Sequence, residues 1–316
     1  MAVSAHTLFA SENHPVFASR TDFARVGAQR FAGQATARFD TGRALTEDEL
    51  RARAPSVFAL AAHESRSERF QPIPTIEIVR ALAKEGFHVV GAKQSGTRDE
   101  TRRDFTKHLL RLRRLDNATA YSVGDTVCEI LLKNANDGSS AYDLMAGLFR
   151  IRCLNSMVSQ TATLDSLKVR HSGDVAGKVI EGTYTVLDAA QKTLAAPQDW
   201  STVRLNNDES AILAEAAHLL RFADAEGNIE TPIKPAQLLI PRRYDDRSPD
   251  LWTQFNVVQE NVIRGGLRGV GRDANNRRRR VTTREVNGID QDVKLNKALW
   301  LIGAKMAELK GIRAAA

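Results

Sequence analysis

The densest group of side chains that could do chemistry in this sequence is a run of arginines. Residues 265–280 read GGLRGVGRDANNRRRR, which is six arginines and four glycines in sixteen positions. A guanidinium donates paired hydrogen bonds to phosphate oxygens, and glycine has no side chain that would hold the backbone away from a ligand. The segment therefore predicts a flexible loop that binds phosphate groups.

The excess of positive over negative charge in the chain is confined to this region. Between Arg264 and Arg284 eight arginines stand against one acid, Asp273, so this window carries the whole formal net charge of +7, and the other basic and acidic side chains cancel. Scattered charge mainly keeps a protein soluble, whereas a local surplus indicates a surface for a polyanion. The arginines that we expect to bind are Arg264, Arg268, Arg272, Arg277, Arg278, Arg279, Arg280 and Arg284.

Two segments that alternate between apolar and basic residues predict a second cationic surface. They are FTKHLLRLRR (105–114) and LFRIRCL (148–154). Alternate side chains of a strand lie on one face, so two such strands in suitable register would give an antiparallel sheet an open face with a row of cations. Such a face suits the backbone of single-stranded DNA, with Tyr142 as the candidate for base stacking; the alternative is an ordinary solvent-exposed face. The cations of this surface are Lys107, Arg111, Arg113, Arg150 and Arg152.

Motifs for catalysis, metal binding or nucleotide binding are weak. His63 and Glu64, in HESRSER, lack the second histidine of an HExxH zinc site, and alternating acids and arginines more often form internal ion pairs. GDVAGKV (173–179) lacks the glycine spacing of a phosphate-binding loop, and Val179 stands where that loop has serine or threonine. We therefore expect no catalytic residue, no metal site, no cofactor and no enzymatic activity.

Cysteine usage and the N-terminus indicate a cytoplasmic protein. Cys128 and Cys153 give neither a disulfide framework nor a CxxC pair, and both lie in apolar segments typical of buried thiols in a reducing compartment. The first residues contain no basic start followed by a continuous apolar stretch, as a secretory signal has. No run approaches the roughly eighteen apolar residues of a membrane-spanning helix, so we expect no membrane partner.

The order of the elements predicts an α+β fold, with an antiparallel sheet and packed helices in the N-terminal half and a mostly helical C-terminal half. A capping box formed by Thr46 and Glu49 predicts a first helix, and Thr75 opens a second helix that ends at Gly86. The turn signal NDG (136–138) predicts a hairpin. The expected strands are 87–90, 105–114, 127–133 and 148–154.

Helical periodicity dominates the rest of the chain. A long helix is expected over 175–194, and a later one begins with Ser248 as its N-cap and ends at Gly265, with a buried stripe of Leu251, Phe255, Val258 and Val262. The last helix has an apolar stripe that is either core or a seam for a partner helix: Leu295, Leu299, Ile302, Met306 and Leu309.

We divide the chain into three parts on these patterns. They are a flexible arm over 1–44, an α+β domain over 45–197 and a mainly helical region over 198–316, which contains the arginine-rich loop 264–284.

Several strings also resemble a known family when they are taken together. They are APSVF, HESRSERFQPIPT, FTKHLLRLRR, NANDGSSAY, VIEGTYTVL, LWTQFNVVQENVIRGG and GIDQDVKLNKALW, and they extend over about residues 45–310. In this order they resemble the Domain of Unknown Function 932 family, which is carried by phages and plasmids and includes proteins of cryptic prophages. The resemblance implies an origin in a mobile element, and it supplies no catalytic residues.

A looser similarity concerns element order alone. One helix, several strands with a hairpin and then a long helix are similar to the core of RecT and Red-beta type annealing proteins, which bind single strands and assemble as rings or filaments. This is an analogy at the level of fold. Together with the cationic surfaces it predicts a protein of a phage or plasmid that binds single-stranded DNA, acts in recombination or strand annealing, and forms a homo-oligomer. The alternatives are a binder of double-stranded DNA or RNA, and a mobile-element protein that binds an acidic host protein.

Overall fold

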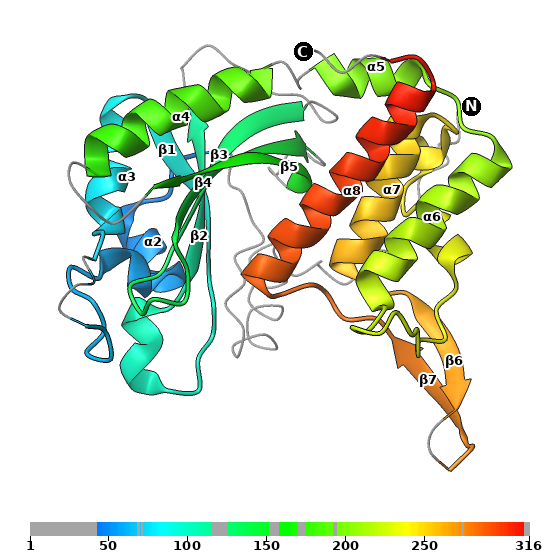
Figure 1. Cartoon of the computed structure of the whole chain (residues 1–316), viewed down its shortest axis with the longest axis horizontal. Helices are drawn as coiled ribbons and strands as arrows, with labels where there is room; N and C mark the ends of the chain where they lie inside the picture. The colour runs from blue at the N-terminus through cyan, green and yellow to red at the C-terminus, as the bar shows by residue number, and fades with distance from the viewer. Residues whose placement is uncertain are drawn as a thin grey trace, which may run out of the picture. The chain divides into compact units, whose positions relative to one another are not determined.

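The computed structural model describes residues 43–67, 70, 72–115, 126–151, 158–169, 175–191, 195–272 and 275–312. Of the arm expected over 1–44, only Arg43 and Ala44 fall within these ranges. The α+β fold is confirmed: a sheet with packed helices forms the N-terminal half, and helices make up most of the C-terminal half (Figure 1). The boundary expected at residue 197 stays a prediction.

One antiparallel sheet of five strands, hydrogen-bonded in chain order, forms the N-terminal half. The second strand begins later than expected, because a 3-10 helix, η2 (Glu100–Phe105), precedes it. The turn predicted at 136–138 connects β3 to β4, and Gly138 adopts a φ of 77° there. The sequence patterns did not predict the fifth strand. The strands are β1 (Phe87–Gln94), β2 (His108–Arg114), β3 (Thr126–Asn134), β4 (Tyr142–Ile151) and β5 (Val158–Val169).

Helices cover one face of this sheet. The capping box of Thr46 and Glu49 is present and starts the first described helix, as expected. Residues at alternate strand positions, such as Leu110 and Leu132, are fully buried in one apolar core together with residues of the helices. The elements on this side are α2 (Glu47–Arg53), the 3-10 helix η1 (Pro55–Phe58), α3 (Thr75–Lys84) and α4 (Val175–Gln191) (Figure 1).

His108 is a fully buried histidine in this core. Its Nδ1 lies 2.9 Å from Ser56 Oγ, and its Nε2 lies 3.0 Å from Thr75 Oγ1. Burial lowers the pKa of His108 from 6.5 to about 4, because the charged ring loses its hydration. The fold therefore requires the neutral ring.

This burial predicts acid-sensitive stability. The folded pKa lies below the unfolded one, so the contribution of His108 is complete above pH 6.5 and is lost as the pH falls towards about 4. At pH 4.5 the free energy of unfolding should be lower than at pH 7 by roughly 2 kcal/mol from this residue alone. Urea titrations of the wild type and His108→Gln measure it. An equal pH dependence in both proteins would contradict the assignment.

The opposite face of the sheet packs against the last helix, α8 (Ile289–Leu309). Ile289 and Val293 of α8 join a small apolar cluster with Leu109, Leu131 and other strand residues. Ion pairs surround this cluster: Asp290 of α8 pairs with Lys107 and Lys133, and Asp292 pairs with Lys93. This face is therefore covered by the protein itself, at least where α8 begins.

A second apolar core holds the C-terminal helices together. The stripe predicted for α7 is confirmed, since Leu251, Phe255, Val258 and Val262 are all nearly fully buried in it. The predicted N-cap was wrong by two positions: the Asp250 side chain accepts from the Thr253 backbone, so Asp250 caps α7. The helices are α5 (Ala196–Thr202), α6 (Asn207–Phe222), α7 (Leu251–Arg264) and α8, with the 3-10 helices η4 (Pro235–Leu239) and η5 (Tyr244–Arg247).

The apolar stripe of α8 is mainly core. Leu295 and Leu299 are buried among the C-terminal helices, and Ile302 and Met306 pack against the same core. Leu309 differs, because it is 87% exposed at the end of the helix. The stripe therefore belongs to the fold of the chain as far as Met306. None of the described helices combines the length and apolar character needed to cross a bilayer.

Candidate nucleic-acid interface

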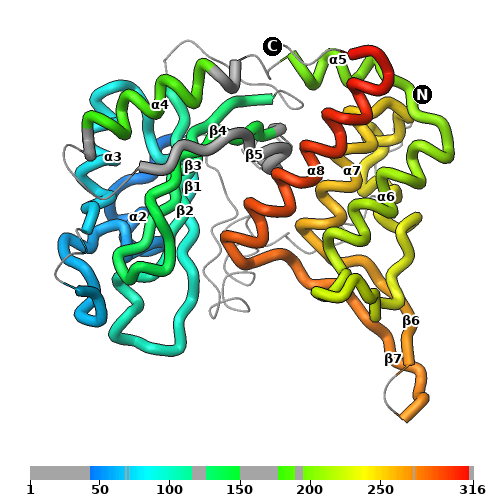
Figure 2. Tube along the Cα trace, viewed as in Figure 1, coloured from blue at the N-terminus to red at the C-terminus, as the bar shows by residue number. Residues whose placement is uncertain are grey.

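The arginine-rich segment forms a two-stranded antiparallel ribbon, which corrects the expectation of a flexible loop. Strand β6 (Arg268–Arg272) pairs with β7 (Arg278–Thr282) over five residue pairs. The ribbon lies between α7 and α8 in the chain and projects beyond the helices (Figures 1 and 2). Its strand residues include valine and threonine, which favour strands, and the glycines do not prevent pairing.

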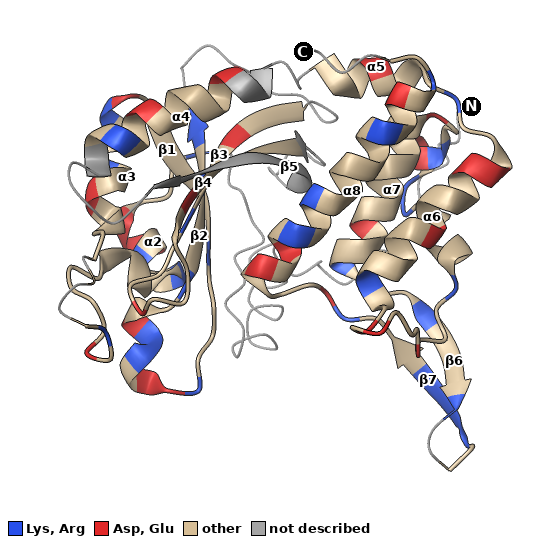
Figure 3. Ribbon diagram, in the orientation of Figure 1, with Lys and Arg blue, Asp and Glu red and all other residues tan. Residues whose placement is uncertain are grey.

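The register divides the arginines between the two faces of the ribbon. Directly opposed residues of an antiparallel pair lie on the same face. The pairs Arg268–Thr282, Val270–Arg280 and Arg272–Arg278 therefore share one face, and every residue in them is exposed. This arginine face carries four guanidiniums on a surface five residue pairs long. Figure 3 shows that basic residues lie on both strands of the ribbon. The other face carries Gly269, Gly271, Arg279 and Val281.

The glycines have a structural function in the ribbon. A Cβ at Gly269 would lie 2.8 Å from the Pro232 carbonyl oxygen, and a Cβ at Gly271 would lie 3.4 Å from the Pro232 ring. These positions let the second face of the ribbon lie against the segment that contains Pro232. We expected the glycines to let a ligand approach the backbone closely. Instead they let the ribbon pack against Pro232 of the same chain, and this packing leaves the arginine face directed outward.

Most of the arginines have no carboxylate partner within the part of the chain that the structure describes. Arg264 pairs with Glu260 at 3.0 Å. Arg272 donates to the backbone and side-chain oxygens of Asn276, which closes the tip of the ribbon without neutralising the charge. Of the arginines in this segment, those with no ion pair to an acid among the described residues are Arg268, Arg272, Arg278, Arg279, Arg280 and Arg284.

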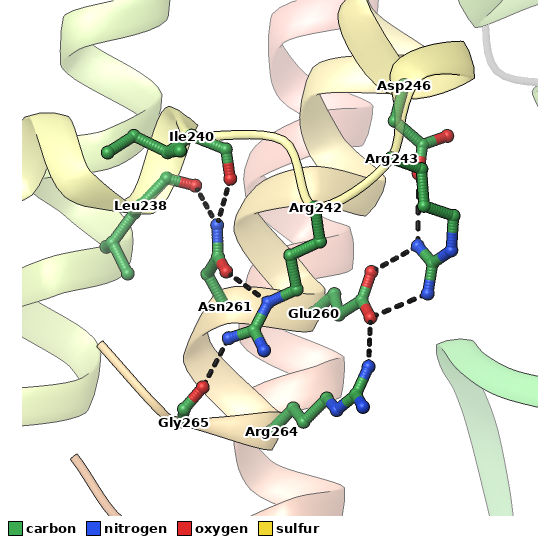
Figure 4. A network of polar contacts seen from close by, with 9 residues as sticks. All are labelled: Leu238, Ile240, Arg242, Arg243, Asp246, Glu260, Asn261, Arg264 and Gly265. Carbon is green, nitrogen blue, oxygen red and sulfur yellow. Dashed lines mark hydrogen bonds and ion pairs between the residues drawn. The ribbon is translucent and has the colours of Figure 1, made fainter. Parts of the chain in front are cut away.

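A partly buried network of polar contacts lies at the base of the ribbon (Figure 4). Asn261 of α7 donates to the carbonyl oxygens of Leu238 and Ile240 and accepts from Arg242 Nε at 2.8 Å. Arg242 in turn donates to the carbonyl oxygen of Gly265, the residue that follows α7. The segment before α7 is thereby joined to the first residue of the chain that leads into the ribbon.

Glu260 is the electrostatic centre of the same network. Its carboxylate accepts from Arg243 and Arg264, and Arg243 also pairs with Asp246 (Figure 4). The hydrogen bond to Glu260 raises the pKa of Arg243, whereas burial lowers the pKa of Arg242. The sequence analysis missed these residues. The string QEN (259–261) falls on a helix with a clear apolar stripe. The structure shows that all three polar residues are buried, and buried polar residues need internal partners.

Loss of Asn261 should destabilise the protein. Replacement by leucine removes the hydrogen-bond partner of the buried Leu238 carbonyl oxygen, and also that of the Ile240 carbonyl oxygen and of Arg242 Nε, so the free energy of unfolding should fall by about 2 kcal/mol. Denaturant titration measures it. Asn228→Ala is the matched control, because Asn228 is exposed and binds only Asp224, and its substitution should change stability by about 0.5 kcal/mol at most.

Comparison with known proteins places the chain in a family. The model of the family described as Domain of unknown function (DUF932) matches residues 62–300. The chain belongs to this family. Two proteins of Escherichia coli (strain K12), UPF0380 protein YfjQ and UPF0380 protein YafZ, are each 42% identical to it over 275 residues, which is 87% of this chain and 95% of theirs. No solved structure matches the chain, so the similarity to the annealing proteins has no structural support.

In this DUF932 protein, the cations expected on the open sheet face have internal partners. Arg111 and Arg113 both bind Glu129, which is 1% exposed, and Arg113 is itself 3% exposed. Lys107 pairs with Asp290, and its side chain is 14% exposed. The structure therefore corrects the expectation of an open cationic row, because carboxylates of the protein already neutralise these three side chains.

Of the two remaining strand arginines, only Arg150 falls within the described strands, and its register position does not extend that row. Arg150 pairs in register with Thr126, and Arg111 pairs with Leu131 on the same strand, β3. Thr126 and Leu131 are an odd number of residues apart, so these two register positions lie on opposite faces of the sheet. Arg152 lies outside the described residues. Tyr142 is fully buried, so the expectation that it stacks on a base is also wrong.

The weak motifs contribute no second site among the described residues. His63 is 5% exposed, with Nδ1 2.9 Å from Ser65 Oγ and its ring edge against Phe105. Burial raises the pKa of the Cys128 thiol to about 12, which makes it a poor nucleophile, and Cys153 lies outside the description. The described part of this DUF932 chain holds no group of three or more histidine, cysteine or acidic side chains that could bind a metal ion.

Proposed function

We propose that the β6–β7 ribbon binds the phosphate backbone of nucleic acid. The observation that carries the proposal is the arginine face: Arg268, Arg272, Arg278 and Arg280 lie together on one exposed face, and no acid of the described residues pairs with them. Like charges held this close repel one another, so a ligand that supplies a line of anions gains affinity from all of them. The phosphates of a nucleic acid form such a line.

Duplex DNA suits this ribbon better than single-stranded DNA, which the sequence patterns favoured. Non-specific single-strand binding combines cations with aromatic side chains that stack on bases. The segment 264–284 contains no aromatic residue, and the sheet surface assigned to a single strand is neutralised by Glu129 and Asp290. The groove of a duplex, in contrast, accepts a two-stranded ribbon. Recombination, annealing and assembly into rings or filaments remain predictions.

The salt dependence of DNA binding tests the proposal. Replacing the four arginines of the arginine face with alanine should lower the slope of log affinity against log salt by about 3 to 4, because each phosphate contact contributes about 0.9. Fluorescence anisotropy with a labelled duplex between low and moderate salt measures the slope.

A control variant removes the same charge elsewhere. Lys84, Arg98, Arg103 and Lys305 are exposed and distant in sequence from the ribbon, and their replacement with alanine should leave the slope almost unchanged. Equal slopes in the wild type and the ribbon variant would exclude a binding role for the arginine face. Competition between single-stranded and duplex oligonucleotides decides which form is preferred.

An acidic host protein is the other partner that this charge fits. It would be indicated by retention of a protein on the wild-type ribbon after nuclease treatment, together with an absence of salt-dependent DNA binding. Both assays use the full chain.

A further inference from the structure

Val270 is the one apolar residue on the arginine face. It is 53% exposed and pairs directly with Arg280, at the middle of the five residue pairs of the ribbon. Arg268 and Arg272 flank it on its own strand, and Arg278 lies beyond Arg280 on the same face. An exposed valine among four cations is unfavourable in water and becomes favourable when a ligand covers it.

The lengths of the side chains decide what Val270 can reach. An arginine side chain extends far enough to contact a phosphate while the ribbon stays outside the DNA. A valine side chain is short, so it contacts a ligand only if the ribbon backbone itself comes close. Contact between Val270 and DNA therefore requires that the ribbon enter a groove.

The dimensions of the ribbon agree with entry into the major groove. Two paired strands are about 5 Å apart, and a strand of five residues extends about 17 Å. The major groove is about 12 Å wide and admits a two-stranded ribbon. The opposite face is occupied along β6, where Gly269 and Gly271 lie against Pro232, so the arginine face is the one that meets the DNA.

We propose that the ribbon inserts into the major groove of duplex DNA and places Val270 and Arg280 against the edges of the bases, while Arg268, Arg272 and Arg278 hold phosphates. This inference rests on the proposed function and extends it from backbone binding to base readout. Arg280 can donate two hydrogen bonds to N7 and O6 of guanine, and Val270 can contact the methyl group of a neighbouring thymine. The preferred sites would then contain a guanine next to a thymine.

Three single variants separate the two kinds of contact. Val270→Ala should weaken binding to a preferred duplex about tenfold without changing the salt slope, because it removes apolar contact and no charge. Arg280→Ala should relax the base preference in a selection from random duplexes. Arg278→Ala is the matched control: it should lower the salt slope by about 1 and leave the base preference unchanged.

A fourth variant tests whether a loss of binding in Val270→Ala comes from distortion of the ribbon. Val270→Thr keeps the branched shape and strand preference of valine but adds a hydroxyl, so it should also weaken binding if the contact is apolar. Wild-type affinity in both Val270 variants, no base preference in the wild type, or a preference for single strands would overturn groove insertion. If the wild type instead shows no salt-dependent binding to DNA, the proposed function itself fails.

Discussion

Replacement of Glu129 with glutamine should lower the free energy of unfolding by about 3 to 5 kcal/mol. Glu129 is 1% exposed in the middle of the sheet, and its two carboxylate oxygens accept hydrogen bonds from Arg111 and Arg113. Glutamine removes the negative charge that faces both guanidiniums, and Arg113 is only 3% exposed, so water does not replace that charge. Chemical denaturation at neutral pH measures the loss.

The surface pair of Glu47 and Arg80 provides the control for Glu129. It has the same paired hydrogen bonds, at 2.9 and 2.8 Å, but its side chains are more than half exposed. Water screens such a pair, so Glu47→Gln should leave the stability almost unchanged. Equal losses in the two variants would mean that the effect comes from the substitution and not from burial of the charge.

Replacement of Gly265 with alanine should destabilise the protein by about 3 kcal/mol and weaken binding of the ribbon to DNA. Gly265 has a φ of 65° and a ψ of −150°, a backbone conformation that only glycine adopts readily. A Cβ there would also lie 2.6 Å from the backbone carbon and oxygen of Arg284. Because both atoms belong to the backbone, one strand of the ribbon base must move away from the other.

Two other glycines separate the causes of this effect. Gly227 has a φ of 86°, but a Cβ there would meet nothing within 4 Å, so Gly227→Ala tests backbone strain alone. Gly96 has neither a strained φ nor a close neighbour, so Gly96→Ala should be nearly neutral. A Gly265→Ala protein as stable as the Gly96→Ala protein would show that the ribbon base adapts freely. Thermal denaturation and duplex affinity are both measured.

Local signals in the sequence were sufficient to predict most of the helices. The capping box at Thr46 and the apolar stripe of α7 depend on residues within a few turns of one another, and both are present. The strand β5 was missed because its sequence, VSQTATLDSLKV, mixes small polar residues with few large apolar ones and resembles a loop. It pairs with β4, its neighbour in the chain, so the weak apolar pattern of the strand itself is what hid it.

The ribbon conformation of the candidate site was not predicted. The excess of arginine identified residues 264–284, yet glycine is compatible with a loop and with close packing, and only the contact with Pro232 decides between them. The alternation in β2 was correct, but it could not reveal that Glu129 on the next strand lies against Arg111 and Arg113. Partners that come together only through tertiary structure are absent from local patterns.

Pro232 packs against the face of the ribbon that carries Gly269 and Gly271, so the arginine face is the one turned away from the protein. In the proposed complex with a double helix, one molecule would contact one side of the cylinder, and the opposite side would stay open to another protein. Copies bound in succession would face the same way only when their centres are separated by whole helical turns, which is about 10 base pairs or a multiple of it.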